Sequence, residues 1–252
     1  MKIKMKRTVK YQHIFSIVIL LVYSTVSYAQ WKPAGDRIMT EWGEQTDVGN
    51  VLPEYPRPLM ERDEWMNLNG LWDYAIRPAG ESTPESYDGE ILVPFAVESS
   101  LSGVGKELGE ANELWYRRTF SVPSRWKGQR ILLHFGAVDW KATVWVNGNE
   151  AGVHTGGYTP FAFDVTEYLK KGRNELTVKV WDPTDKGVQA RGKQVSKPGH
   201  IWYTPVSGIW QTVWMEWVPA VYVKKLELTP LYEKETVHVS LLLNHPISGC
   251  SD

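Results

Sequence analysis

Residues 130–182 decide the fold, and they read RILLHFGAVDWKATVWVNGNEAGVHTGGYTPFAFDVTEYLKKGRNELTVKVWD. β-Branched and aromatic residues recur at every second position in three runs, as Ile131 and Leu133 do in the first. A period of two points alternate side chains to opposite faces, which predicts strands with one face buried. Asn147-Gly148 lies where two such runs meet, and this pair accepts the positive φ values of a tight hairpin turn. The segment therefore predicts an antiparallel sheet.

The alternation continues on both sides of this stretch. Strand-like runs of apolar and aromatic residues occupy residues 70–76, 91–94, 114–122, 209–218 and 237–243. Asp164 and Glu167 have the spacing of a helix-cap pair, and Gly172 can end the short helix that they begin. Strands separated by polar turns, with a single short helix, predict an all-β chain.

Length and charge limit the classes of function. At 252 residues the chain has room for one or two domains. The net charge is −1, but the first 29 residues contain five of the basic side chains and no acid. The remaining residues carry 23 basic and 29 acidic side chains, a net charge near −6. Nucleic-acid binding needs a basic face, so we expect no nucleic-acid partner.

The first 29 residues are typical of a secretory signal peptide. Basic residues precede an apolar run at residues 14–23, which is too short to span a bilayer as a helix. Ser27 and Ala29 supply the small residues of a cleavage site, and we expect cleavage after Ala29. The mature chain would then be secreted or periplasmic, without a membrane span. The alternative is an uncleaved membrane anchor, which amino-terminal sequencing of the exported product distinguishes.

Thirteen tryptophans are many for a chain of this length. Each buries a large area but keeps an N–H group that needs a partner. Most of those in strand-like runs are predicted to lie in the core: Trp72, Trp145, Trp181, Trp210, Trp214 and Trp217. The alternative is an exposed ring that stacks on the C–H face of a sugar, and composition alone does not separate the two uses.

Five longer phrases carry a resemblance to a known family. They are RPLMERDEWMNLNGLWDY, LWYRRTF, LHFGAVDWKATVWVNG, HTGGYTPFAFDVTEYLKKGRNELTVKVWDP and IWYTPVSGIWQTVWME. In this order, across about residues 56–218, they resemble the N-terminal sugar-binding domain of glycoside hydrolase family 2. That family contains β-galactosidases, β-glucuronidases and β-mannosidases.

The resemblance implies a jelly-roll-like β-sandwich, similar to galactose-binding domains, over residues 30–218. It implies an immunoglobulin-like sandwich next, of which residues 219–252 are the first strands. A TIM barrel with the active site follows in the family. We therefore expect this chain to be the N-terminal part of a secreted, β-galactosidase-like hydrolase of O-glycosidic bonds. Full-length members can also form homo-oligomers.

Catalysis in the family implies that this chain is inactive alone. Members hydrolyse glycosides with retention, using two barrel glutamates, so no catalytic residue carries over to this chain. Asn112-Glu113 and Asn174-Glu175 echo the family's acid/base dipeptide, but they lie beside domain strands and are interpreted as structural. The glycan substrate would be reached through the missing barrel, and no cofactor is expected.

A polar loop over residues 182–199 is the candidate for substrate contact, because long loops without structure of their own are often functional. Some members place an acidic residue just before the segment that matches Ile201-Trp202; this chain has none there, which puts that contact and its cation in doubt. The predicted substrate-binding residues are Arg191, Lys193, Gln194, His200 and Trp202. The alternative is that the charges are solvated and Trp202 anchors the loop.

Other motifs favour simpler interpretations. Asp139-Trp140 and Gly156-Gly157-Tyr158 are interpreted as turn residues at strand ends. His134 and His154 lack a second ligand at metal spacing, so no zinc site is predicted. Two further hypotheses stay open: a free-standing carbohydrate-binding module without hydrolase activity, and a structural domain without sugar affinity.

Overall fold

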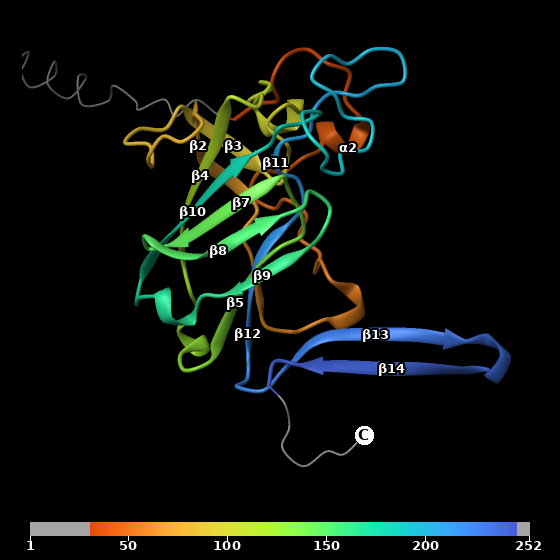
Figure 1. Ribbon diagram of the computed structural model, residues 1–252. Helices are drawn as coiled ribbons and strands as arrows, with labels where there is room; N and C mark the ends of the chain where they lie inside the picture. The colour runs from red at the N-terminus through yellow and green to blue at the C-terminus, as the bar shows by residue number, and fades with distance from the viewer. Residues whose placement is uncertain (1–30, 246–252) are drawn as a thin grey trace, which may run out of the picture. The chain divides into compact units, whose positions relative to one another are not determined.

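The computed structural model describes residues 31–245. The predicted signal peptide and its cleavage site lie outside the described residues, as does Cys250. Within residues 31–245, no helix is both long enough and apolar enough to cross a bilayer. Strands account for most of the ordered elements, and they form two large antiparallel sheets (Figure 1). The predicted all-β sandwich is confirmed.

The larger sheet has six antiparallel strands. In spatial order they are β3 (Gly89–Val93), β2 (Gly70–Pro78), β4 (Asn112–Ser121), β10 (Arg173–Trp181), β7 (Lys141–Val146) and β8 (Asn149–Thr155). The turn between β7 and β8 is the predicted hairpin, with positive φ at Asn147 and Gly148. Asparagine and glycine permit this backbone, so the pair fixes the register of both strands.

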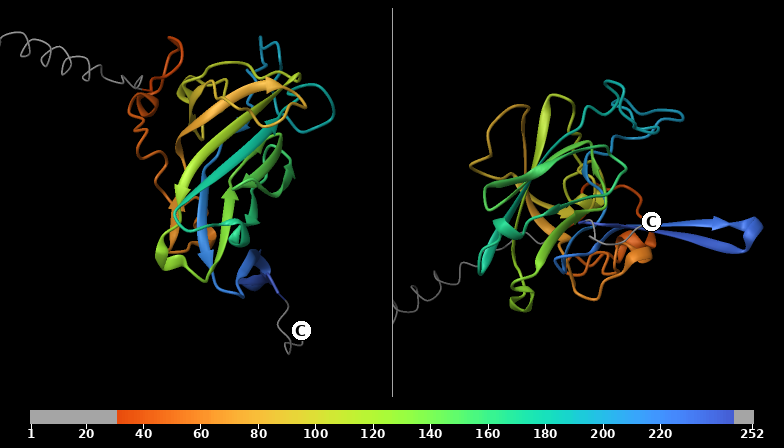
Figure 2. Two further views of the ribbon diagram at one scale, coloured as in Figure 1. Left: turned by 90° about the vertical axis from the view of Figure 1, so that its left-hand side faces the viewer. Right: turned by 60° about the horizontal axis from the view of Figure 1, so that its bottom comes forward.

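The smaller sheet has four antiparallel strands and forms a second layer (Figure 2). In spatial order they are β1 (Trp65–Asn67), β12 (Val213–Val218), β5 (Arg130–Phe135) and β9 (Phe161–Asp164). The strand predicted at residues 209–218 is divided, because β11 (Gly208–Ile209) pairs with β6 (Val138–Asp139) in a separate ladder. Two more backbone hydrogen bonds join the same segments: the Gly136 N–H donates to the Thr212 carbonyl, and the Trp210 N–H donates to the Ala137 carbonyl.

The core lies between the two layers and is built by alternation. On β10, Leu176, Val178 and Val180 are fully buried. Their neighbours Lys179 and Trp181 therefore point to the outer face of the larger sheet. The tryptophan prediction is right for Trp72 and Trp214, which are buried, and for Trp217, which is partly buried but packs against the core. It is wrong for Trp145, Trp181 and Trp210, which are partly buried and do not pack against that core.

A hairpin follows the sandwich. β13 (Val223–Leu231) pairs with β14 (Thr236–Leu243), and Figure 1 shows them as a separate two-stranded ribbon. Its pairs Leu226–Leu241 and Leu228–Val239 lie on one apolar face. This hairpin occupies the place where the resemblance puts the first strands of the immunoglobulin-like sandwich.

Helical elements are short. They are α2 (Glu41–Glu44) and the 3-10 helices η1 (Pro58–Met60), η2 (Ser100–Ser102), η3 (Ser124–Trp126), η4 (Thr166–Tyr168) and η5 (Tyr232–Lys234). The helix expected after Asp164 is η4, but the residue at its N-cap is Val165, which makes no side-chain cap bond. The Asp164 carboxylate accepts the Thr166 backbone N–H at 3.1 Å, which is a turn bond and not the predicted cap. The helix ends at Tyr168, before Gly172, and β10 begins at Arg173.

Candidate functional site

The rim loop, residues 182–207, is closed at its base by buried hydrogen bonds. One carboxylate oxygen of Asp182 accepts the Thr184 backbone N–H at 2.7 Å, and the other accepts the Ser207 hydroxyl at 2.7 Å. The Ser207 backbone N–H donates to Glu98 Oε2 at 2.9 Å. The two ends of a polar loop are thus held together on the rigid end of β10, which is the arrangement that binding loops need.

The rim loop folds back on itself above this base. The Val195 backbone N–H donates to the Tyr203 carbonyl at 3.1 Å, and the Tyr203 N–H donates to the Lys193 carbonyl at 3.0 Å. These two bonds bring residues of both arms together. The Lys193 ammonium nitrogen lies 6.0 Å from the centre of the Tyr203 ring. A cation and an aromatic face therefore lie side by side at the surface.

The five predicted contact residues do not all take part in this arrangement. Lys193 and Gln194 lie on one arm of the backbone ladder, and Trp202 lies on the other arm, next to Tyr203. Arg191 and Gln194 are partly buried, and each has a side-chain atom without a hydrogen-bond partner within residues 31–245. His200 is exposed in the turn between the arms, with φ of 55°. Their role in binding stays a prediction.

Trp202 is relevant to the alternative that the loop residues are only structural. Its backbone N–H donates to the Gly199 carbonyl at 3.0 Å, which closes the turn. Its side chain is 44% exposed. An anchoring ring would be buried, so the exposed indole favours contact with something outside the loop.

Residues beneath the rim loop were interpreted only as turn residues, and this interpretation is incomplete. Asp139 belongs to β6 and is 8% exposed, with no hydrogen bond to its carboxylate within the described residues. A Cβ atom at Gly157 would lie 2.4 Å from Asp139 Oδ1, so only glycine fits there. Tyr158 packs against Trp210 with ring centres 6.0 Å apart. A Cβ atom at Gly192 would lie 3.3 Å from the Tyr158 hydroxyl, which places this tyrosine against the rim loop.

Three carboxyl groups give this region its electrostatic character. Burial raises the pKa of Glu98 and of Asp182 above their usual values. Burial, followed by the charges of Asp182 and Glu98, raises the pKa of Asp139 to about 7. Asp139 therefore changes its charge near neutral pH, unlike an ordinary surface aspartate. Within residues 31–245, no three His, Cys, Asp or Glu side chains are placed to hold a metal ion.

Comparison with known proteins identifies the domain to which residues 104–219 belong. Residues 104–219 match the family model for glycosyl hydrolases family 2, sugar binding domain. The chain contains a family 2 sugar-binding domain. The matched range runs past β12 and includes the whole rim loop together with Asp139. The family 2 domain therefore coincides with most of the sandwich.

Relatives of this family 2 domain are glycosidases by name. The chain is 38% identical over 165 residues to a β-galactosidase of Thermoanaerobacter pseudethanolicus, covering 63% of this chain and 21% of the relative. It is 32% identical over 133 residues to a β-glucuronidase of Paenibacillus borealis, covering 50% and 22%. The chain thus matches about a fifth of the length of these curated relatives.

A solved structure supports the same assignment. The β-glucuronidase of Lactobacillus rhamnosus aligns with a TM-score of 0.57 and 27% identity, covering 76% of this chain and 35% of that chain. The β-glucuronidase of Faecalibacterium prausnitzii, 24% identical with a TM-score of 0.56, shares the fold. Only about a third of such an enzyme is therefore comparable with this chain.

A second charged cluster lies on the outer face of the smaller sheet of the family 2 domain. Glu216 on β12 is completely buried there. Its carboxylate accepts the Tyr55 hydroxyl at 2.6 Å and the Arg57 guanidinium at 2.8 Å, and Arg62 binds the same oxygen as Arg57. His134 Nε2 lies 2.9 Å from that oxygen. The lead-in segment before β1 is thus tied to the sheet by one buried carboxylate.

Hydrogen bonds decide the protonation of this cluster. Burial alone would raise the pKa of Glu216, but hydrogen bonds from His134 and Tyr55 and the charge of Arg57 lower it to about 2. Burial raises the pKa of Tyr55 to about 12 and lowers that of His134. Glu216 is therefore ionised across the physiological range, and Tyr55 is a neutral hydrogen-bond donor to it.

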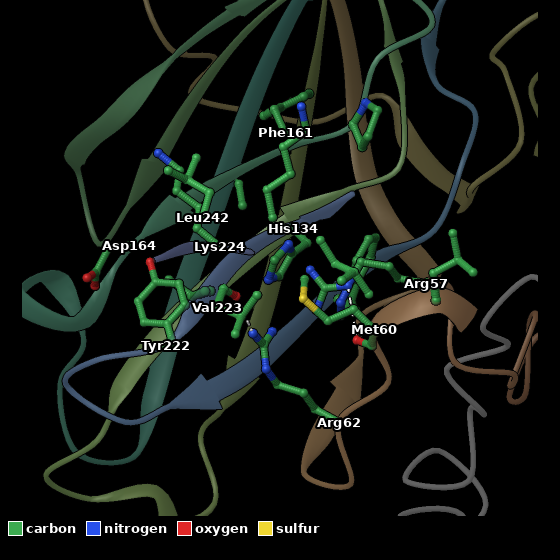
Figure 3. Close-up of a pocket in the computed structure, with 17 residues that line it drawn as sticks. Arg57, Met60, Arg62, His134, Phe161, Asp164, Tyr222, Val223, Lys224 and Leu242 are labelled. Carbon is green, nitrogen blue, oxygen red and sulfur yellow. Dashed lines mark hydrogen bonds between the residues drawn. The ribbon is translucent and has the colours of Figure 1, made fainter. Parts of the chain in front are cut away.

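The cluster also forms part of the wall of a cavity of about 720 Å³ between the smaller sheet and the hairpin (Figure 3). Figure 3 shows Arg62 and His134 facing this space together with Tyr222 and Leu242. Arg62 donates to the Val223 carbonyl at 2.9 Å as well as to Glu216. Its guanidinium therefore connects the sandwich to the first residue of the hairpin, and these charges are used in internal contacts.

Proposed function

We propose that this chain is the N-terminal part of a secreted, β-galactosidase-like family 2 glycoside hydrolase. The rim loop of the domain contributes polar and aromatic side chains to the edge of a glycan pocket. Hydrolysis itself is carried out by two carboxyl groups outside residues 1–252. On its own, the chain binds at most one side of the substrate and does not turn it over.

The observation that carries this proposal is the family 2 match over residues 104–219, combined with the exposed aromatic rings of the rim loop. The first curated relative is named a β-galactosidase and is about five times longer than the matched segment. A rim loop with Arg191, Gln194 and Trp202 offers donors, an acceptor and a ring face, which is the chemistry that sugar hydroxyls and C–H faces require.

Neither Asn-Glu dipeptide supplies the pair of groups that retaining hydrolysis needs. Such enzymes need two carboxyl groups about 5–5.5 Å apart across an open cleft. Glu113 is instead paired with Lys179 at 3.0 Å. Asn174 is buried, and its side-chain amide donates to the Lys170 carbonyl at 3.0 Å. Both Asn-Glu dipeptides are therefore used in structural contacts.

The purified 252-residue chain is expected to release no chromophore from nitrophenyl β-galactoside or nitrophenyl β-glucuronide. The reason is that the proposed acid/base and nucleophile both lie outside residues 1–252. Continuous absorbance assays at high protein concentration check this. The matched control is the product of the gene read beyond Asp252, which should be active on the β-galactoside if it encodes a barrel. Turnover by the 252-residue chain would refute the proposal that the catalytic groups lie outside it.

In that longer product, Arg191→Ala and Trp202→Ala are each expected to lower kcat/KM about tenfold, corresponding to about 1.4 kcal/mol of transition-state binding. Each removes a directional donor or a ring face from the pocket edge. Val188→Ala is the control, because that side chain is fully exposed in the same loop. If both variants keep the parent kinetics, the rim loop is only a solvated connection.

A free-standing carbohydrate-binding module is the second candidate, favoured by the exposure of Trp202 and Tyr203. The two functions differ in one measurement. A module binds its glycan without any further domain, whereas a pocket edge alone binds weakly. Titration of the 252-residue chain with galactosides separates them.

A further inference from the structure

The outer face of the larger sheet carries a second candidate binding site. A groove of about 610 Å³ opens there. Its lining residues are Ala79, Glu110, Glu113, Trp140, Lys141, Thr143, Thr155, Lys179 and Trp181. None of them belongs to residues 182–207, although Trp181 directly precedes that loop and Trp140 directly follows Asp139.

Strand register explains why these residues meet. Trp181 on β10 lies opposite Lys141 on β7, and Lys141 lies opposite Thr155 on β8. In the next row, Lys179 lies opposite Thr143. Those on β7 and β10 point away from the core, because Ala142 and Val180 between them are core residues, and Thr155 on β8 is exposed. The groove is therefore built on rigid strands and does not depend on a loop conformation.

Two tryptophans form an aromatic corner in the groove. The rings of Trp140 and Trp181 have centres 6.1 Å apart and meet at 72°. The Trp181 indole N–H donates to the Glu110 carbonyl at 2.8 Å, which fixes the orientation of the ring. Both side chains are only partly buried. A fixed, partly exposed indole is suited to packing against the C–H face of a pyranose ring, and the second indole provides a side wall.

Polar side chains lie beside the two tryptophans, within hydrogen-bonding distance of one another. Lys179 Nζ lies 3.0 Å from Glu113 Oε1, and Glu113 Oε2 accepts the Gly80 backbone N–H at 3.2 Å. The Lys179 ammonium also lies 5.4 Å from the centre of the Trp115 ring, which holds it over the sheet. An ammonium and a carboxylate held together provide a donor and an acceptor for neighbouring hydroxyls.

The charge of the lining indicates which kind of chain fits. Its ionisable residues are two lysines and two glutamates, so the charges balance. A polyanion would require an excess of cations, and a basic peptide would require an excess of carboxylates. We propose that this groove binds a neutral oligosaccharide of pyranose units, with Trp181 as the stacking ring and the Lys179–Glu113 pair as the hydroxyl-binding groups.

Titration of the 252-residue chain tests the proposal. The probes are neutral tetrasaccharides of β-linked galactose, xylose and glucose, with polygalacturonate as a charged comparison, measured by calorimetry and tryptophan fluorescence. At least one neutral probe is expected to bind at millimolar concentration or below. Trp181→Ala is expected to weaken that binding at least tenfold, and Lys179→Met several-fold.

Two controls make the outcome specific. Trp42→Ala removes a tryptophan that is 79% exposed elsewhere on the domain and should leave the affinity unchanged. Thr155→Arg obstructs the groove from an exposed position, so it should weaken binding even if Trp181→Ala does not fold. No binding of any neutral probe, equal affinity in Thr155→Arg, or preference for polygalacturonate would each overturn the assignment. Because the readout is binding by this chain, it is separate from the kinetic test of the proposed hydrolase.

Discussion

Glu216→Gln is expected to lower the free energy of unfolding by about 3–5 kcal/mol, the usual cost of removing one partner from a buried ion pair. The carboxylate is completely buried, and it neutralises two guanidinium groups that are themselves mostly buried. Its loss leaves Arg57 and Arg62 with their charges partly desolvated and without a counter-ion. Urea unfolding followed by tryptophan fluorescence measures the change.

A surface pair on the larger sheet provides the matched control. Asp73 lies 2.9 Å from Arg117, and both side chains are more than a third exposed. Asp73→Asn should therefore cost less than about 1 kcal/mol, as exposed ion pairs do. Equal losses of stability in the two variants would mean that removing the buried Glu216 charge costs no more than removing an exposed one, which would contradict this prediction.

Acid titration gives a second readout of the same carboxylate. The folded pKa of Glu216 is about 2, below its ordinary value of 4.5. Because the folded value is the lower one, its contribution to stability is complete above about pH 5 and is lost as the pH falls toward 2. The parent protein should therefore lose stability steeply in this window, whereas Glu216→Gln should lose less.

The contrast between Glu216 and its partners shows how far the sequence could predict this cluster. Alternation in the phrase around residues 209–218 predicts a strand with large residues on both faces, and the structure places Glu216 within it. The partners Tyr55 and Arg57 lie about 160 positions earlier, in a proline-rich segment without periodicity. A local sequence pattern does not show which distant residues come into contact, so the cluster could not be predicted.

The stacked tryptophans on the outer face of the larger sheet show a different limit. Trp145 lies on β7 between Val144 and Val146, and those valines are fully buried. Alternation alone would have placed Trp145 on the outer face, but size and hydrophobicity argued for the core. It is partly covered because it stacks on Trp115 across the outer face, with ring centres 5.8 Å apart. The two rings bury one another, which hydrophobicity alone does not predict.

The rim loop was located correctly from its length and polarity, but what lies beneath it was not. Asp139 stands at the end of a strand-like run, where an aspartate usually caps a turn. The structure instead pairs it with Gly208, about 70 positions later, in the short ladder of β6 and β11. Asp139 is buried because of this pairing and because its carboxylate packs against Gly157. Neither contact can be predicted from residue spacing along the chain.

Asp139→Asn is expected to raise the free energy of unfolding at pH 8 by about 2–4 kcal/mol. The folded pKa of this carboxyl is about 7, against an ordinary value of 3.8, so ionising it in the folded protein is costly. A shift of this size corresponds to about 4 kcal/mol at most, at about 1.4 kcal/mol per pKa unit. The amide has nearly the same shape and is never charged, so it removes this cost.

The sign of the pH dependence separates this explanation from simple repacking. A carboxyl whose folded pKa is raised destabilises the protein fully above about pH 7 and has no such effect below about pH 4. The difference between Asp139→Asn and the parent should therefore vanish on acidification from pH 8 to pH 4. Asp164 is the control of opposite sign, since hydrogen bonds from Thr166 and Arg130 outweigh burial and lower its pKa. Asp164→Asn should lower stability at pH 7, and a gain for Asp139→Asn that persists at pH 4 would show that packing, and not charge, limits this site.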